Sequence, residues 1–281
     1  MSRDRFERAL LRVLRPLVVA VLFAATAFPF FYMVTLSVRD IQELILHPGS
    51  ILPRDPTLST YADVLGRQGF LTFMRNSAIV ATASVAVTLL ISIPGAYAVA
   101  RLRFFGRRQV HFLFLAVYLF PAIVLAIPLF TLFTMMGLRG SLAGLILVYI
   151  AQTVPVTVYM LRNYFESVPR SVEEAAAIDG CGRVETIWRV VLPLSKPALA
   201  ATGLYIFMIA WNEFLFALLF LVEKRDSWTV SLGLAQLSGG IEVPTTVLMA
   251  GSVVLTLPIV VLFFAGERLL TEGLTAGAEK G

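Results

Sequence analysis

The apolar residues of this chain are gathered in long blocks separated by polar or glycine- and proline-rich joints. Each block is about 20 residues long, and at about 1.5 Å rise per residue a helix of that length crosses a hydrocarbon core of about 30 Å. This block length predicts membrane-spanning helices rather than the strands of a barrel. The six predicted spans are residues 16–37, 73–100, 110–136, 142–161, 198–222 and 247–266.

Composition supports a membrane protein. Of the 281 residues, 58% are hydrophobic and 15% are charged, and the mean hydropathy is +0.83. Water-soluble domains rarely reach such values. The expected fold class is therefore an all-α integral membrane protein.

The first span could be mistaken for a secretory signal. Five arginines precede it, and Ala25-Thr26-Ala27 resembles a small-residue cleavage site. Its apolar run continues to Leu36, which is longer than the apolar core of a signal peptide. We expect an uncleaved anchor.

Positive charge is distributed unevenly between alternate joints. Five Lys or Arg residues precede the first span, four lie in 101–108, five in 162–196 and two in the tail, against six in the alternate joints. By the positive-inside rule, both termini are cytoplasmic. This predicts a cytoplasmic amino-terminal segment (1–15), a six-helix transmembrane domain (16–266) and a cytoplasmic tail (267–281). The predicted outer segments are 39–72, 137–140 and 223–246.

The sequence lacks the residues that several kinds of chemistry require. One cysteine and two histidines can form neither an internal disulfide nor a zinc site from protein ligands alone. The sequence contains no phosphate-binding GxxxxGK[ST] loop, no HExxH and no GxSxG. The net charge of +5 comes from arginines that flank the spans, so no nucleic-acid partner is expected. Because the spans hold almost no ionisable groups for an ion relay, the energy for any transport must come from elsewhere.

The spans also contain helix-distorting and small residues. Ala78, Thr82 and Ala86 recur every fourth residue, which gives a small face where helices can pack closely. Proline removes a backbone donor, so each proline within a span is expected to kink its helix. These prolines are Pro94, Pro121, Pro128, Pro155 and Pro258.

The cytoplasmic segment 171–197 is predicted to form two short helices with a glycine hinge. Ser171 and Glu174 have the spacing of a capping box at the start of the first helix. Three consecutive alanines follow on a solvent-facing helix, and Gly180 occupies the position of a helix stop with positive φ. The apolar stripe of the second helix, which Pro193 should end, consists of Val184, Ile187, Trp188 and Val191.

This segment resembles the EAA coupling motif of binding-protein-dependent ABC importer permeases, EAA-x3-G followed by x9-I-x-LP. The matching residues are Glu174, Ala175, Ala176, Gly180, Leu192 and Pro193, and Val190 replaces the isoleucine of the family. The resemblance implies that this loop docks into a cleft of the cytoplasmic ATPase and transmits the closure of the ATPases to the spans.

The resemblance extends over nearly the whole chain. Four further strings of this chain resemble the carbohydrate-uptake branch of the family, and in particular its maltose-type second permease. These strings are PTLSTYADVL, NSAIVA, AYAVARLRFFGRR and AWNEFLFAL. The resemblance implies the type I importer fold, sugar import across a bacterial or archaeal cytoplasmic membrane, and no catalysis. The implied partners are a second homologous permease, two ATPase subunits, an extracytoplasmic sugar-binding protein and membrane lipid. No cofactor is expected in this chain, because ATP and Mg would bind to the ATPases.

Trp211, Asn212 and Glu213 are candidate residues of the translocation pathway. A carboxylate within a span costs about 2.5 to 3.5 kcal/mol, so it should face a cavity or a hydrogen-bonding partner. The cluster could bind sugar hydroxyls, or Glu213 could be satisfied by a neighbouring helix. Since the resemblance implies that the other permease supplies most substrate contacts, the structural role is favoured.

Two further segments are candidate contact sites. The outer loop tip at Ser238, Gly239 and Gly240 is either a contact of the binding protein or an ordinary connector. Composition alone predicts that the tail GLTAGAEKG is disordered. Its resemblance to the tail of the family's second permease instead implies that it inserts between the two ATPases. The tail residues concerned are Gly273, Leu274, Thr275, Ala276, Gly277 and Lys280.

Two rival functions remain open. One is an importer of the same class for another solute, such as a glycerophosphodiester or an amino acid, although a phosphorylated solute would favour cationic groups that the spans lack. The other is a self-sufficient secondary carrier. It would be active alone under an ion gradient.

Overall fold

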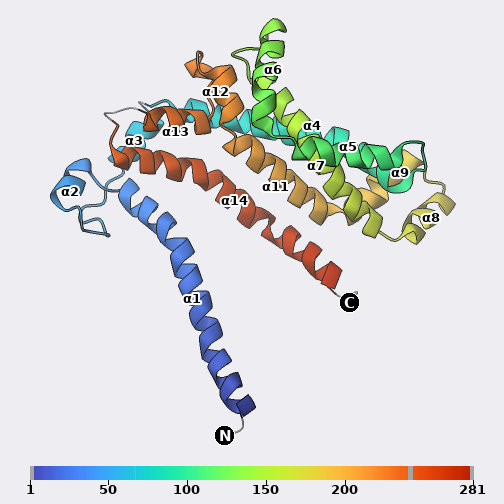
Figure 1. The fold of residues 1–281 in the computed structure, drawn as a ribbon, viewed down its shortest axis with the longest axis horizontal. Coiled ribbons are helices and arrows are strands. Elements are labelled where there is room, and N and C mark those ends of the chain that lie inside the picture. The colour runs from blue at the N-terminus through green and yellow to red at the C-terminus, as the bar shows by residue number, and fades with distance from the viewer. Residues whose placement is uncertain (1–2, 67, 240–242, 279–281) are drawn as a thin grey trace. The chain divides into compact units, whose positions relative to one another are not determined.

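The structure, a computed structural model, describes residues 3–66, 68–239 and 243–278, and the regular elements in these ranges are all helical (Figure 1). Two compact units make up the chain, one of residues 1–70 and 236–256 and the other of residues 71–235 and 257–281. The long helices are α1 (Arg3–Ser37), α4 (Phe70–Arg101), α5 (Arg107–Leu119), α6 (Ala122–Met135), α7 (Leu142–Ser167), α11 (Lys196–Asn212) and α14 (Thr245–Ala278). The short ones are α2 (Ile41–Leu46), α3 (Ser59–Leu65), α8 (Arg170–Ile178), α9 (Arg183–Thr186), η1 (Ile187–Val191), α10 (Leu192–Leu194), α12 (Leu215–Leu221), η2 (Arg225–Ser227) and α13 (Val230–Ser238).

Four described helices, α1, α4, α7 and α14, are each long and apolar enough to cross a membrane. They contain the predicted spans 16–37, 73–100, 142–161 and 247–266. A fifth candidate is α11 counted together with the segment before it, which meets it at a bend of 83°. The full number of six spans therefore remains a prediction.

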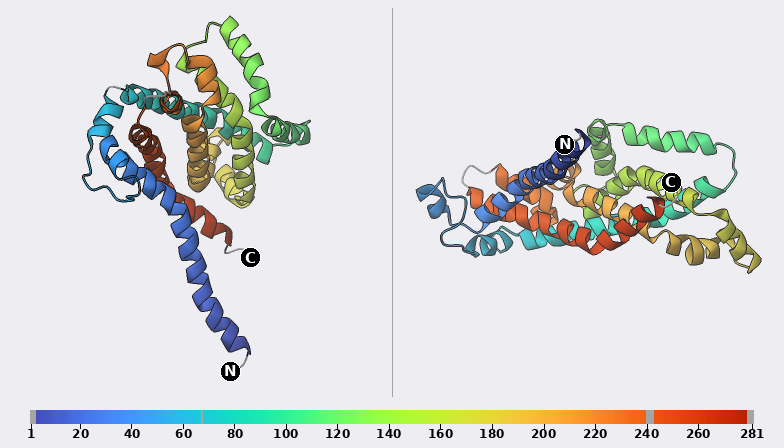
Figure 2. Two further views of the ribbon diagram at one scale, coloured as in Figure 1. Left: turned by 60° about the vertical axis from the view of Figure 1, so that its left-hand side comes forward. Right: turned by 90° about the horizontal axis from the view of Figure 1, so that it is seen from below.

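The two other predicted spans are each divided into two helices, and the kink predicted at Pro121 takes the form of a complete break. The span 110–136 is broken between α5 and α6, where Phe120 has an extended backbone before Pro121 (Figure 2). A residue before proline avoids the helical region, and proline has no N–H to continue the ladder. The span 198–222 is broken at Glu213, whose backbone is extended between α11 and α12.

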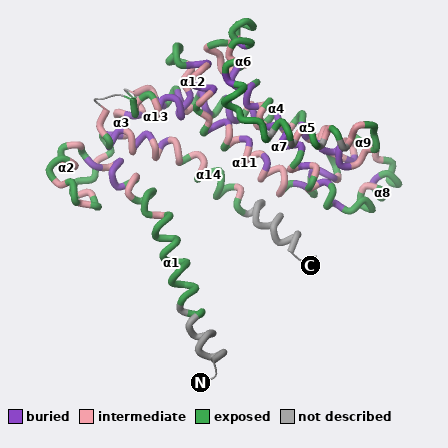
Figure 3. The backbone as a smooth tube through the Cα atoms, in the orientation of Figure 1, coloured by how far each residue is buried: buried purple, intermediate pink, exposed green. Residues whose placement is uncertain are grey.

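In the first unit, α1 is exposed over most of its length (Figure 3). The chain after it is organised around Arg39, whose 0% exposure is unusual for a charged residue. Its guanidinium donates to the Glu43 carboxylate at 3.0 Å and to the carbonyls of Ser50 at 2.7 Å and His47 at 3.1 Å. One buried cation thus closes the loop around α2.

In the second unit, α7 is the central helix and packs against α5, α11 and α12. Many of its residues are buried, which distinguishes it from α1 (Figure 3). One apolar cluster joins α4, α7 and the segment after α8. It consists of Ala96, Tyr97, Ala100, Val158, Leu161, Phe165, Val191 and Leu192. This cluster holds the base of the predicted coupling segment against two spans.

Candidate coupling and transport sites

The first coupling helix, α8, starts one residue earlier than predicted. It begins at Arg170 after Pro169, and no side chain caps it, so the predicted capping box of Ser171 and Glu174 is wrong. Because the helix already includes Arg170, Ser171 lies within the first turn rather than at the N-cap. The predicted stop at Gly180 is confirmed by its φ of +87°.

The end of α8 is a Schellman motif. The Cys181 N–H donates to the Ala176 carbonyl at 2.9 Å, and the Gly180 N–H donates to the Ala177 carbonyl at 3.1 Å. This pattern requires a left-handed residue at Gly180, a conformation that glycine adopts at little cost. The hinge between the two coupling helices is therefore encoded by a single glycine.

The second coupling helix differs from the predicted one. It starts with α9, passes through the π-helical turn η1 and ends with α10, so that the break falls at Ser195 rather than at Pro193. A π turn inserts an extra residue into the helical repeat and shifts which residues share a face. As a result the predicted stripe divides, with Val191 buried and Val184 and Trp188 exposed.

The outer face of α8 exposes small and apolar side chains. Ala175 and Ala177 are exposed as predicted, whereas Ala176 is buried. Ile178 is 86% exposed, and Glu174 is exposed beside it. Apolar side chains that are exposed on a helix outside the spans are typical of a docking surface.

The inner face of α8 is fastened to α4 by polar contacts that the sequence analysis missed. Glu173 accepts a hydrogen bond from the Tyr97 hydroxyl at 2.9 Å. It also forms an ion pair with Arg101, whose guanidinium donates to the Glu173 carboxylate at 2.7 Å. Arg101 also donates to the Val168 carbonyl, at 2.7 Å. The available signal was the spacing of Tyr97 and Arg101, which places both on one face of a helix, but their partner lies more than seventy residues away.

The candidate pathway residues have three different environments. Trp211 is buried, and its ring stacks on Phe207 with centroids 5.3 Å apart. Asn212 is exposed and donates to the Met208 carbonyl of its own helix at 2.9 Å. Glu213 is half-buried and accepts from the Tyr149 hydroxyl at 2.7 Å and from the Phe216 N–H at 2.9 Å. The Glu213 contacts match those expected for a structural carboxylate.

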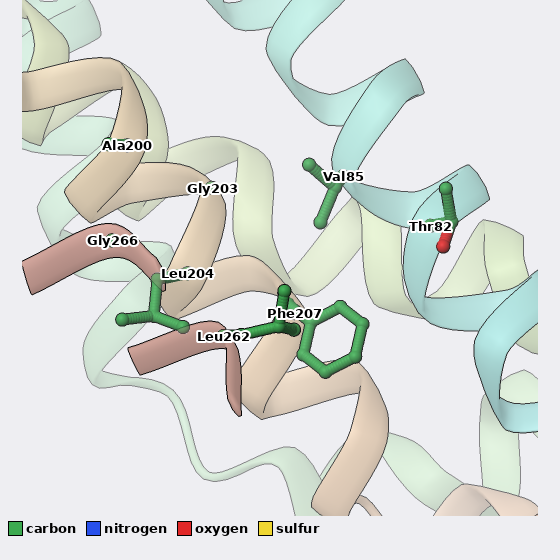
Figure 4. A pocket seen from close by; sticks show the side chains of 8 residues that line it. All are labelled: Thr82, Val85, Ala200, Gly203, Leu204, Phe207, Leu262 and Gly266. Atoms are coloured by element: carbon green, nitrogen blue, oxygen red, sulfur yellow. The ribbon is translucent and has the colours of Figure 1, made fainter. Parts of the chain in front are cut away.

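Two cavities of the second unit differ in the polarity of their linings. One, of about 290 Å³, is formed by α4, α11 and the later part of α14 (Figure 4). Thr82 supplies a hydroxyl, and the rest of its lining, including Val85, Leu204 and Phe207, is apolar. The other, of about 350 Å³, lies at the α5–α6 break and includes Gln152 and Tyr205. The lining of the second cavity includes the side-chain amide of Gln152 and the hydroxyls of Thr153 and Tyr205, whereas that of the first includes one side-chain hydroxyl.

The remaining candidate residues lie at element ends. Ser238 is the last residue of α13, Gly239 follows in an exposed turn, and Gly240 lies outside the described residues. In the tail, Gly273, Leu274, Thr275, Ala276 and Gly277 continue the backbone helix of α14. Lys280 also lies outside the described residues. The contacts predicted for the outer loop tip and for the tail therefore stay predictions.

Known proteins provide an independent comparison. A family model described as "binding-protein-dependent transport system inner membrane component" matches residues 89–271. The chain is 38% identical to the inner membrane ABC transporter permease YcjP of Escherichia coli strain K12, covering 93% of this chain and 94% of that protein. It is 36% identical to the trehalose/maltose permease MalG of Thermococcus litoralis, covering 98% and 99%.

A solved structure agrees with this assignment. The fold matches a bacterial ABC transporter involved in the import of the acidic polysaccharide alginate, with a TM-score of 0.80 and 25% identity over 95% of this chain and 98% of that one. The helices around α7 thus form the type I ABC permease fold, and the chain belongs to the family of binding-protein-dependent transport-system inner membrane components.

Proposed function

We propose that this chain is a membrane permease subunit of a sugar ABC importer and that the outer face of α8 receives the ATPase. The observation that carries the proposal is the exposure of Ile178, Ala175 and Ala177 on a short helix outside the spans. The small residues let a partner approach the backbone closely, and Ile178 is an apolar side chain ready to enter a pocket. Val184 and Trp188 extend this surface beyond the hinge.

The solute is proposed from the relatives. Besides the trehalose/maltose permease, they include a sulfoquinovosyl glycerol permease of Agrobacterium fabrum strain C58, which is 36% identical over 95% of this chain. We infer a sugar or glycoside as the solute of this chain. The cavity beside Gln152 and Tyr205 offers an amide and aromatic faces for it, and Asn212 remains a second candidate.

The proposed topology has six spans with both termini in the cytoplasm. In its support, the predicted outer segments 137–140 and 223–246 contact each other through the ion pair of Arg139 with Glu223. The Gly140 N–H also donates at 2.9 Å to the carbonyl of Phe220, near the outer end of the predicted span 198–222. Asn76, at the start of α4, donates to the Asp226 carbonyl at 2.8 Å. At the opposite end of α4 from Asn76, Arg101 pairs with Glu173 of α8. These contacts support a topology in which 137–140 and 223–246 lie on one side of the membrane and 101–108 and 162–196 on the other.

The proposed assembly contains a second permease, two ATPases and an extracytoplasmic binding protein. The small face of α4 at Ala78, Thr82 and Ala86 is exposed within this chain, and we propose that the second permease packs there. Ser238 to Gly240 would contact the binding protein. The carboxyl-terminal end of α14 would enter the ATPase dimer.

The docking proposal is tested with Ile178→Glu. Because Ile178 is exposed, the substitution should leave the fold intact but place a charge in an apolar contact, which costs about 2 kcal/mol or more at an interface centre. We expect the purified variant to lose the ATPases and sugar uptake. Leu46→Glu, at an apolar position in the predicted outer loop that is 71% exposed, is the control and should retain both. Normal ATPase binding by Ile178→Glu would contradict the proposed docking face.

A further inference from the structure

Besides its outer docking face, α8 has an inner face held by a compact polar cluster. Tyr97 and Arg101 are one turn apart on α4, and each donates to a different oxygen of Glu173. Arg101 also donates to the Val168 carbonyl at the end of α7. One guanidinium therefore connects α4, the end of α7 and α8.

The burial of this cluster makes its connection stiff. The side chains of Arg101 and Glu173 are only 8% and 13% exposed, and Tyr97 is buried. Both oxygens of the carboxylate are occupied, and a charge-assisted hydrogen bond is about twice as strong as a neutral one. Removing one partner would leave the other charge buried and uncompensated, an arrangement that proteins avoid.

We propose that Tyr97, Arg101 and Glu173 form a latch that transmits the movement of α8 to α4 and thereby sets how many solute molecules cross for each ATP hydrolysed. The inference rests on the proposed function and adds to it. The docking face receives the ATPase, whereas the latch on the opposite side of the same helix passes the displacement to a span. These three residues are positioning residues, because they act through the helices they join.

A second ion-pair cluster nearby provides a matched control. Glu166 accepts from Arg107 at 3.1 Å and from Arg162 at 2.8 Å, and it joins α5 to α7 through partners that both lie outside α8. The side chains of Arg107 and Glu166 are 34% and 35% exposed, so solvent screens the pair and its contribution is small. Glu166→Gln thus removes the same charge from an Arg pair outside the latch.

The mechanical part of the proposal is tested on the isolated permease. Cys181 is the single cysteine of the chain and lies directly after Gly180, so a spin label on the native thiol reports the mobility of α8 without further substitutions. We expect Glu173→Gln to increase the mobility of the label and Glu166→Gln to leave it unchanged. Equal mobility in wild type and Glu173→Gln would overturn the latch.

The functional part is tested in proteoliposomes that contain the complete complex, with maltose, trehalose and diacetylchitobiose as probes. We expect Glu173→Gln to retain its ATPase subunits and hydrolyse ATP, while the ratio of sugar transported to ATP hydrolysed falls at least about fivefold, the lower end of typical coupling between sites. Tyr97→Phe, which keeps the ion pair, should give a smaller fall, and Glu166→Gln no change.

Two outcomes would overturn the latch in this assay. One is an unchanged transport ratio in Glu173→Gln. The other is the loss of bound ATPase, which would make Glu173 a docking residue instead. If the wild-type complex showed no ATP-dependent uptake of any of the three sugars, the proposed function would fail, while the spin-label result would still decide the mechanical claim.

Discussion

Gly180 is the residue whose local role follows most directly from its chemistry. Its φ of +87° lies in the left-handed region, and a Cβ placed there would meet no atom within 4 Å. Any penalty for a side chain at this position therefore comes from backbone strain rather than from a clash. The pattern of alanines followed by glycine was sufficient to predict this stop.

Gly180→Val should strain the hinge, because a β-branched residue in the left-handed region costs about 1 to 3 kcal/mol. We expect sugar uptake to fall at normal expression, and Gly180→Asn to retain more activity because asparagine tolerates this conformation. Gly182→Val is the control: Gly182 also has open space around its Cβ position, but its φ is −72°. Equal uptake in the two valine variants would argue against a strained hinge.

Glu213 shows what sequence alone leaves open. The sequence identified a costly carboxylate and two possible roles, but its partner Tyr149 lies 64 residues away in the chain and only the fold brings them together. The carboxylate also accepts from the Phe216 and Ala217 amides at the start of α12. It thus caps a helix in the middle of a predicted span.

Glu213→Ala should lower the stability of the purified permease by about 2 to 3 kcal/mol, since hydrogen bonds to a charged group and a helix cap are lost together. Asn212→Ala should leave the thermal midpoint nearly unchanged, because that exposed side chain bonds only within its own helix. A melting curve of each variant in detergent tests this. If Glu213→Ala melted like wild type but transported no sugar, a pathway role would replace the structural one.

At the scale of elements, hydrophobic blocks predicted where helices occur but not where they break. The four long spans follow from apolar length alone, as α7 and α14 illustrate. A distortion at Pro121 was predicted from the conformational restriction that proline imposes, but the complete break between α5 and α6 was not. The π turn at Ile187–Val191 has no comparable sequence signal, and it is the reason that the predicted apolar stripe divided.

The loop around α2 should be sensitive to acid. The Arg54 backbone N–H, and to a smaller extent the Arg39 guanidinium, hold the pKa of the Glu43 carboxyl below its ordinary value despite partial desolvation. A depressed pKa in the folded state contributes stability that is present above the unfolded pKa, about 4.3, and lost as the pH falls through the folded value. Pepsin cleavage of segment 40–57 should therefore increase below about pH 4.3.

Glu43→Gln provides the control for this acid response. The amide cannot titrate, so cleavage in this variant should be less dependent on pH than in wild type. A wild-type loop that showed the same cleavage rate on both sides of this pH range would contradict a stabilising role for the ionised carboxylate.

At the scale of the whole molecule, sidedness is the claim that organises every proposed contact. In a variant lacking Cys181, Ser238→Cys should react with an impermeant thiol reagent added to intact cells, because Ser238 is exposed at the end of α13. Native Cys181 should react only after the membrane is opened. Labelling of Cys181 in intact cells would reverse the topology.

Uptake by defined proteoliposomes tests the central claim most directly. The two permeases, reconstituted with or without the ATPases, are supplied with labelled maltose or trehalose, the binding protein, and either ATP or an ion gradient. The account predicts sugar uptake only with the ATPases and ATP, because the spans of this chain carry almost no ionisable groups through which an ion gradient could act. Sugar uptake driven by an ion gradient without the ATPases would contradict it.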